Sequence, residues 1–167
     1  MKITEHYDEA AKNAPWCIAL GSFDGVHLGH KKLIEILREE AVSAGTQSMV
    51  YTFHTHPRKI LIPDRHIYLI TDNKKRSEII EQLGVDMLYL EDFNNIRDMG
   101  AEDFVKNILV DRFSVKSVVI GYNYRFGAKG AGNAAVLKEY GDKYGFRVII
   151  VDAYEVNGHA VSSSLIR

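Results

Sequence analysis

A glycine- and histidine-rich segment between an apolar run and an amphipathic stretch constrains the fold most strongly. It reads Gly-Ser-Phe-Asp-Gly-Val-His-Leu-Gly-His and occupies residues 21–30. The residues just before it, 16–20, are all apolar, and residues 31–44 repeat apolar side chains at helical spacing. This pattern predicts a buried strand, a glycine-rich turn and the start of a helix. Because a helix N-terminus carries unpaired amides and the positive end of the helix dipole, the turn is typical of a phosphate site.

Two other interpretations of this turn remain open. His27 and His30 are three residues apart, a spacing that also suits two zinc ligands, and His54 and His56 could supply further donors. A His-Glu-x-x-His pattern is absent from the sequence, however. Alternatively, the glycines could serve only the geometry of a structural turn.

Composition limits the classes to which the protein can belong. The chain has 167 residues, 46% of them hydrophobic, which fits a single domain spanning 1–167. Lys plus Arg number 21 and Asp plus Glu 22, so the net charge of −1 gives no reason to expect nucleic acid or an anionic membrane as a partner. One cysteine excludes an internal disulfide, and no apolar run reaches transmembrane length. These features favour a cytoplasmic location.

Strand-like and helix-like segments alternate along the chain. Strands are expected at 16–20, 48–53, 85–90, 117–120 and 147–151, with a short edge strand at 2–4; helices are expected at 31–44, between a Thr71 cap and Gly84, at 101–113, and at 134–144 after an Asn133 cap. The alternation predicts an α/β fold, with a doubly wound, Rossmann-like, mostly parallel five-stranded sheet. If the strand order is 3-2-1-4-5, the turns at 21–30 and 121–132 meet in one crevice at the topological switch point.

The C-terminal segment is expected to return to that crevice. Asn157-Gly158 is typical of a two-residue turn, which predicts a small hairpin with strands at 154–156 and 159–161. The following serines, residues 162–164, are typical of a helix N-cap. Their hydroxyls and amides could bind phosphate.

Three motifs together resemble those of a known family. Segment 21–30 resembles the signature of the HxGH nucleotidyltransferase superfamily. With Gly-Tyr-Asn-Tyr-Arg-Phe-Gly at 121–127 and Ser-Ser-Ser-Leu-Ile-Arg at 162–167, it resembles the FAD synthetase (FMN adenylyltransferase) domain of bacterial bifunctional riboflavin kinase/FAD synthetases. The resemblance covers nearly the whole chain. It implies transfer of AMP from MgATP to FMN, giving FAD and pyrophosphate, with Mg²⁺ carried by ATP and no firm protein ligand for a metal.

The resemblance also implies roles for individual residues. The expected catalytic residues are His27, His30, Asn123, Ser164 and Arg167; the expected ATP contacts are Gly21, Phe23, Asp24, Gly29, Ser162 and Ser163; and the expected FMN contacts are Phe53, Pro57, Leu61, Asp64, Tyr124 and Phe126. Adenylyl transfer is an in-line displacement that requires charge stabilisation and no covalent enzyme nucleophile. The two histidines are therefore expected to donate to the triphosphate, whose charge favours protonated imidazole.

Other functions remain compatible with these residues. One is an adenylyl- or cytidylyltransferase for another phosphorylated acceptor, such as a phosphopantetheine or phosphocholine. Another is a flavin or nucleotide sensor that keeps the fold without turnover. The riboflavin kinase segment of the family is expected to be missing from these residues, and the sequence does not distinguish a piece of a bifunctional enzyme from a single-function one. Oligomeric state and a role for residues 1–15 are not predicted.

Overall fold

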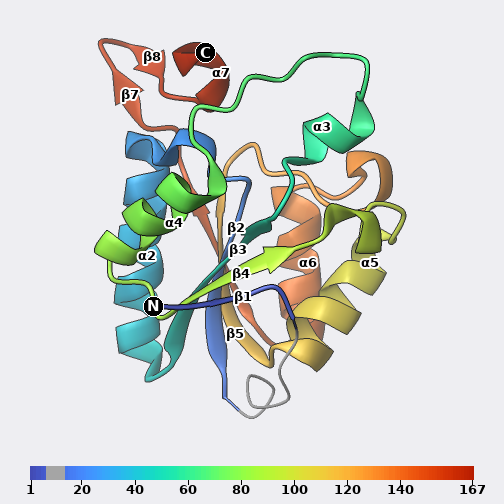
Figure 1. The fold of residues 1–167 in the computed structure, drawn as a ribbon. Helices are drawn as coiled ribbons and strands as arrows, with labels where there is room; N and C mark the ends of the chain where they lie inside the picture. The colour runs from blue at the N-terminus through green and yellow to red at the C-terminus, as the bar shows by residue number, and fades with distance from the viewer. Residues whose placement is uncertain (7–13) are drawn as a thin grey trace.

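A computed structural model of the chain describes residues 1–6 and 14–167, and it has a central sheet with helices on both faces (Figure 1). Part of the lead-in at residues 1–15 thus lies outside the described residues. The strands are β1 (Lys2–Thr4), β2 (Trp16–Leu20), β3 (Gln47–Phe53), β4 (Met87–Glu91), β5 (Val115–Gly121), β6 (Arg147–Val151), β7 (Glu155–Val156) and β8 (His159–Ala160). The longer helices are α2 (Leu28–Ala44), α4 (Asn73–Gln82), η3 (Phe104–Arg112) and α6 (Ala134–Tyr144); the short ones are η1 (Asp24–Val26), α3 (Pro57–Leu61), η2 (Phe93–Asn95), α5 (Ala101–Asp103), η4 (Ala128–Gly130) and α7 (Ser163–Ile166).

The strands of the main sheet follow the order β1-β4-β3-β2-β5-β6, and every pair is parallel. The predicted order 3-2-1-4-5 is confirmed as β4-β3-β2-β5-β6. The predicted short edge strand at 2–4 is confirmed as β1, which pairs with β4 and extends the predicted five-stranded sheet to six strands among the described residues. The chain reverses its direction of winding between β2 and β5, which places the topological switch point at the ends of these two strands.

The core consists of two layers, one on each face of the sheet. Along β2, Trp16, Ile18 and Leu20 belong to the layer that packs against η3 and α6. The alternate residues Cys17 and Ala19 belong to the layer beneath α2 and α4. Since successive side chains of a strand point to opposite faces, burial of the whole run requires helices on both sides, as Figure 1 shows.

Helix boundaries depend on local caps. Helix α2 begins before the predicted residue 31, because the side chain of His27 caps it by accepting the backbone N–H of His30. The predicted Thr71 cap of α4 is wrong, since the side chain of Asp72 accepts the N–H of Lys75 there. Helix α6 has the predicted bounds and the predicted Asn133 cap.

Three further segments can be compared with the elements expected from the sequence. The predicted helix at 101–113 is present, but most of it, η3, is a π-helix. Residues 54–66, which follow the predicted strand at 48–53, contain the short helix α3, whose first residue is Pro57. The predicted hairpin is confirmed as β7 and β8, joined by Asn157-Gly158, and it leads into α7 (Figure 1). Both turn residues have positive φ, 52° and 77°, as this turn type requires.

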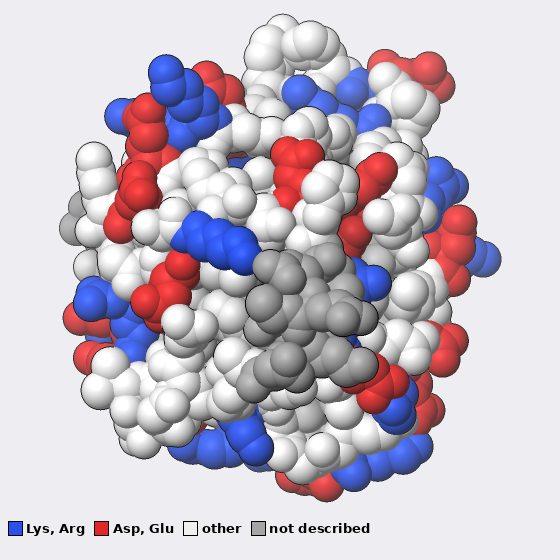
Figure 2. All heavy atoms as spheres, turned by 60° about the horizontal axis from the view of Figure 1, so that its bottom comes forward, with Lys and Arg blue, Asp and Glu red and all other residues white. Residues whose placement is uncertain are grey.

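Charged side chains of both signs are interspersed on the face shown in Figure 2. Lys and Arg do not gather there into one large patch. This mixed surface agrees with the near-zero net charge of the sequence.

Candidate active site

A cavity of about 500 Å³ lies at the carboxyl ends of β2, β3, β5 and β6. The predicted site residues that line it are Gly21, Phe23, His27, Gly29, His30, Phe53, Pro57, Asn123, Tyr124, Ser162, Ser163, Ser164 and Arg167. The cavity therefore brings together the three motif segments, which are far apart in the sequence. Ligand sites of open α/β sheets lie at this switch point.

The turn that carries the histidines has an unusual backbone conformation. Phe23 and Val26 have φ angles of 52° and 39°, which are rare for residues other than glycine and especially for a β-branched one. The amide of Gly25, whose φ is 78°, donates to Oγ1 of Thr71 at 3.0 Å. Such strain persists only where tertiary contacts hold it, and it is common at functional sites.

His27 and His30 lie face to face at the start of α2. Their ring centroids are 3.6 Å apart, with an angle of 19° between the planes. The backbone amide of His30 donates to Nδ1 of His27 at 3.3 Å, so a neutral His27 carries its proton on Nε2 and can donate it to a ligand. Nδ1 of His30 is buried without a hydrogen-bond partner among the described residues.

Burial determines the charge of this pair. Burial, and then the proximity of His27, lower the pKa of His30 from 6.5 to about 3, although Asp24 partly offsets the shift. Burial also lowers the pKa of His27, again with a partial offset from Asp24. Both rings are therefore neutral near pH 7 in the protein alone. The protonated form that the sequence suggests requires the negative charge of a bound phosphate.

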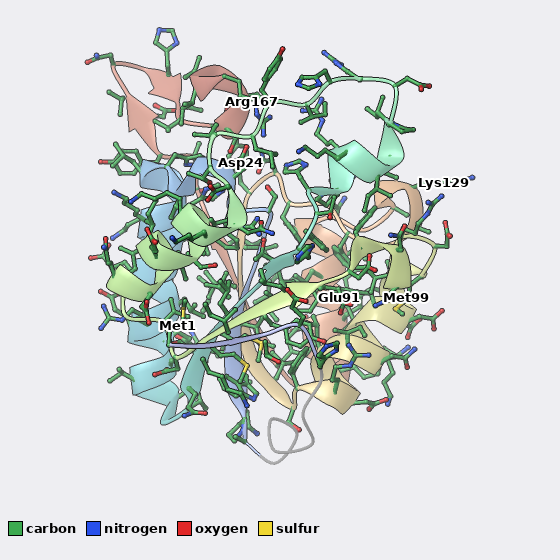
Figure 3. The ribbon with its side chains drawn as sticks, in the orientation of Figure 1. Met1, Asp24, Glu91, Met99, Lys129 and Arg167 are labelled. Atoms are coloured by element: carbon green, nitrogen blue, oxygen red, sulfur yellow. The ribbon has the colours of Figure 1, made fainter. Side chains whose placement is uncertain are left out.

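Asp24 and Arg167 come from opposite ends of the sequence and lie at the same end of the molecule (Figure 3), where Asp24 connects three segments of the chain. Its carboxylate accepts the amides of Ile70 and Thr71 at 2.9 and 3.1 Å and a guanidinium N–H of Arg167 at 2.6 Å. Its carbonyl accepts the hydroxyl of Ser163 at 2.8 Å. Burial alone would raise the pKa of Asp24, but the hydrogen bonds from Arg167 and the two amides outweigh it and lower that pKa. Asp24 does not line the cavity, and the ATP contact implied for it by the motif stays a prediction.

The segment after β5 contributes one polar and one aromatic side chain to the cavity. Asn123 is exposed and lines it together with Tyr124. Burial raises the pKa of Tyr124, so its phenol remains a hydrogen-bond donor. Phe126, predicted to contact FMN, lies instead in the core, with its ring 5.9 Å from that of Phe104.

The segment after β3 contributes the apolar side of the cavity. Phe53 and Pro57 line it, whereas Leu61 and Asp64 do not. Leu61 is 58% exposed at the end of α3, and Asp64 is also exposed. The structure thus places two of the four predicted FMN contacts from this segment outside the cavity.

A metal centre built from protein side chains has no basis in the described residues. They contain no group of three or more His, Cys, Asp or Glu side chains that could hold a metal ion. In the same part of the chain, no helix is long and apolar enough to cross a membrane.

Comparison with known proteins assigns the family. The sequence model of the FAD synthetase family matches residues 9–165. The chain belongs to the FAD synthetase family. Relatives include bifunctional riboflavin kinase/FMN adenylyltransferases from Listeria monocytogenes, 37% identical over 90% of this chain and 48% of the relative, and from Buchnera aphidicola (Schizaphis graminum), 32% identical over 84% of this chain and 46% of the relative. The chain thus spans about half the length of the curated relatives that it matches.

Solved structures share the fold of this FAD synthetase family member. A Streptococcus pneumoniae structure described as a macrolide-efflux protein has a TM-score of 0.82 and 26% identity, and the match covers 99% of this chain and 55% of that chain. A pantoate-beta-alanine ligase from Francisella tularensis has a TM-score of 0.63 and 13% identity, and the match covers 99% of this chain and 72% of that chain. At this identity, the similarity to the ligase concerns the fold alone.

The cavity is also lined by residues that the sequence did not assign to it. His56 was considered only as a zinc donor, yet it lines the cavity and caps α3, with Nδ1 accepting the amide of Arg58 at 3.2 Å. Burial, and then the charge of Arg167, lower the pKa of His56 to about 4. Asp152 and Tyr154 line the cavity just after β6. Their position at the carboxyl end of a parallel strand was a signal that could have found them.

The lowered pKa values of His30 and His56 predict acid destabilisation. Their pKa values fall from 6.5 to about 3 and about 4, so the unfolded chain binds more protons between roughly pH 6.5 and 4. The free energy of unfolding should therefore decrease as the pH falls through this range, by at most about 1.4 kcal/mol per pH unit for each imidazole. Any loss from Asp24 begins lower, below about pH 4.

Urea unfolding at pH 7, 6, 5 and 4.5 measures this dependence. His56→Gln should reduce the slope, because one of the two groups is removed. A free energy of unfolding that does not change between pH 6.5 and 4.5 would contradict the assignment of these imidazoles as buried and neutral.

Proposed function

We propose that this domain transfers AMP from MgATP to FMN and so forms FAD and pyrophosphate. The observation that carries the proposal is the meeting of segments 21–30, 121–127 and 162–167 around one cavity at the switch point. A triphosphate needs donors on several sides, and these segments supply imidazoles, hydroxyls, backbone amides and the guanidinium groups of Arg125 and Arg167. Mg²⁺ belongs to the substrate MgATP and neutralises phosphate charge.

The phosphate oxygen of FMN attacks the α-phosphorus of ATP, the bond from that phosphorus to the bridging oxygen breaks, and pyrophosphate leaves. His27 and His30 donate hydrogen bonds to the phosphate oxygens on which negative charge grows. Ser162, whose side chain caps α7, and the neighbouring serines bind the departing pyrophosphate. Arg167 lines the same cavity and adds a positive charge.

The FMN ring is proposed to lie against Phe53, Pro57 and Tyr124, which provide apolar surface on one side of the cavity. Asn123 can donate and accept, and it is proposed to orient the FMN phosphate. Leu61 and Asp64 have no place in this pocket as it stands. Their predicted FMN contacts would require the end of α3 and the residues that follow it to move.

A substrate screen tests the function. The protein is incubated with MgATP and, separately, FMN, riboflavin or a phosphopantetheine, and products are separated by chromatography while pyrophosphate is assayed. The proposal predicts that only the incubation with MgATP and FMN forms FAD, with an equal amount of pyrophosphate. Pyrophosphate release with phosphopantetheine instead would assign another acceptor, and tight binding of FMN and ATP without any product would indicate a sensor.

Asn123→Ala should lower kcat/KM for FMN by about tenfold, because one hydrogen bond to a charged phosphate is lost. Asn123 is exposed, so the thermal midpoint should remain close to that of the wild type. The matched control is Asn107→Ala, which removes an exposed asparagine of η3 outside the cavity. An unchanged kcat/KM in Asn123→Ala would leave the residue only a loop-forming role.

A further inference from the structure

Helix α4 contains a buried arginine that no motif includes. Arg76 is 5% exposed and does not itself line the cavity. Its guanidinium donates from Nη1 to the carbonyl of Ser22 at 2.9 Å and from Nη2 to the carbonyl of Phe53 at 2.6 Å. A further bond from Nη2 reaches Oδ1 of Asn73 at 2.9 Å. Arg76 therefore joins the chain segments that leave β2 and β3.

These two carbonyls lie where the backbone ladder between β2 and β3 ends. The last aligned pair of the ladder is Leu20 with Tyr51, and beyond it the amide of Gly21 still donates to the carbonyl of Tyr51, at 3.4 Å. Ser22 and Phe53 follow, and both line the cavity. The planar guanidinium thus continues the cross-strand bonding at the point where one segment turns toward His27 and the other toward Pro57.

The charge of Arg76 is unusual for a buried group. Among the described residues, its hydrogen-bond partners are all neutral oxygens, and its Nε is buried without a partner. Burial lowers the pKa of Arg76, and Asp24 partly offsets this, but Asp24 already binds Arg167. An arginine remains charged at neutral pH, so the buried charge of Arg76 is left without an ion-pair partner among the described residues and is only partly offset by Asp24.

We infer that Arg76 is a positioning residue for adenylyl transfer: it fixes the histidine turn relative to the flavin side of the cavity, and its charge attracts the pyrophosphate group. The expected effect on kcat rests on the proposed function, because it is measured with MgATP and FMN. The expected effect on pyrophosphate binding can be measured without FMN. Burying a guanidinium charge against carbonyl dipoles alone costs free energy. The negative charge of a bound polyphosphate would offset part of that cost.

The test uses Arg76→Lys, Arg76→Met and the control Ile80→Ala. Lysine keeps the charge but cannot bridge both carbonyls with a planar fork, whereas methionine removes both properties. Ile80 is fully buried one turn further along α4, belongs to the core and does not line the cavity, so its truncation should destabilise α4 while leaving the cavity lining in place. Inorganic pyrophosphate binding is measured by titration calorimetry, and kcat and KM are measured with MgATP and FMN, all below the unfolding transition of each variant.

Arg76→Met should weaken pyrophosphate binding by about tenfold or more, as expected for the loss of a nearby charge of low solvent exposure. Arg76→Lys should retain most of that binding but show a lower kcat at saturating substrates, because the two sides of the cavity are no longer held together. Ile80→Ala should lower only the thermal midpoint. If Arg76→Met does not fold, Arg76→Lys still decides the positioning role.

Two results would overturn the inference. The first is that Arg76→Lys and Arg76→Met both keep the kcat and the pyrophosphate affinity of the wild type. The second is that Ile80→Ala loses as much kcat and pyrophosphate affinity as the Arg76 variants do. Absence of FAD formation by the wild type would contradict the proposed function but not the inference, which the pyrophosphate titration would still test. Absence of pyrophosphate binding by the wild type would overturn the anion role of Arg76.

Discussion

His30→Ala should lower kcat for FAD formation by about 10²–10³, the usual cost of removing one preorganised donor at a developing anion. The ring of His30 stacks on His27 and lies 5.0 Å from that of Phe23, so the alanine variant also loses some packing. The KM for FMN should change little, because FMN is proposed to bind at the other side of the cavity. His30→Asn can donate a hydrogen bond but cannot carry a proton charge, so it should recover part of the rate.

The matched control is His159→Ala, which removes an exposed histidine of β8 outside the cavity and should leave kcat unchanged. Steady-state kinetics and thermal unfolding of the three variants separate the alternatives. A structural turn predicts a lower midpoint for His30→Ala with a normal kcat, and a zinc site predicts stoichiometric metal in the wild type. A fully active His30→Ala would exclude the proposed mechanism.

Asp24→Ala should lower the free energy of unfolding by about 3 kcal/mol, because removing one partner of a buried ion pair leaves the other without compensation. The Asp24 side chain is 3% exposed and that of Arg167 is 19% exposed, so water does not easily replace the lost partner. The amides of Ile70 and Thr71 would lose their acceptor as well. The KM for ATP should rise in parallel, since Arg167 would no longer be held beside the cavity.

Asp24→Asn keeps an oxygen acceptor for the amides and should lose less stability than Asp24→Ala. Lys75→Ala, which breaks an exposed ion pair with Glu78, serves as the control and should change the free energy of unfolding by less than about 1 kcal/mol. Urea unfolding measures all three variants. When Arg167→Ala is added to Asp24→Ala, the free energy of unfolding should fall little further. If the two substitutions instead lower it additively, the two side chains do not stabilise each other.

Much of the fold was predictable because its patterns are local. The apolar run of β2 requires cover on both faces, and the alternation of strands and helices leaves few topologies for a parallel sheet. Asn133 and Ser162 are followed directly by the helices that they cap. The histidine turn and the segment after β5 were likewise predictable as neighbours, because strand order places the carboxyl ends of β2 and β5 side by side.

Other features depend on contacts between distant residues. Asp24 and Arg167 are 143 positions apart, and nothing near either residue predicts their ion pair. Thr71 and Asp72 are both suitable caps, and tertiary structure uses the first as an acceptor for Gly25 and the second as the cap. From the sequence, Phe126 could contact the flavin or belong to the core. In the structure it packs against Phe104 in the core. Leu61 is apolar in a loop, yet the turn of α3 directs it to solvent.

The destination of each phosphate of ATP tests the central claim most directly. The protein is incubated with FMN and Mg²⁺ together with ATP labelled at either the α- or the γ-phosphorus, and the products are separated. Adenylyl transfer predicts that the α label appears in FAD and the γ label in pyrophosphate, in equal amounts. An α label that remains in ATP or AMP, or a γ label that enters the flavin, would contradict it.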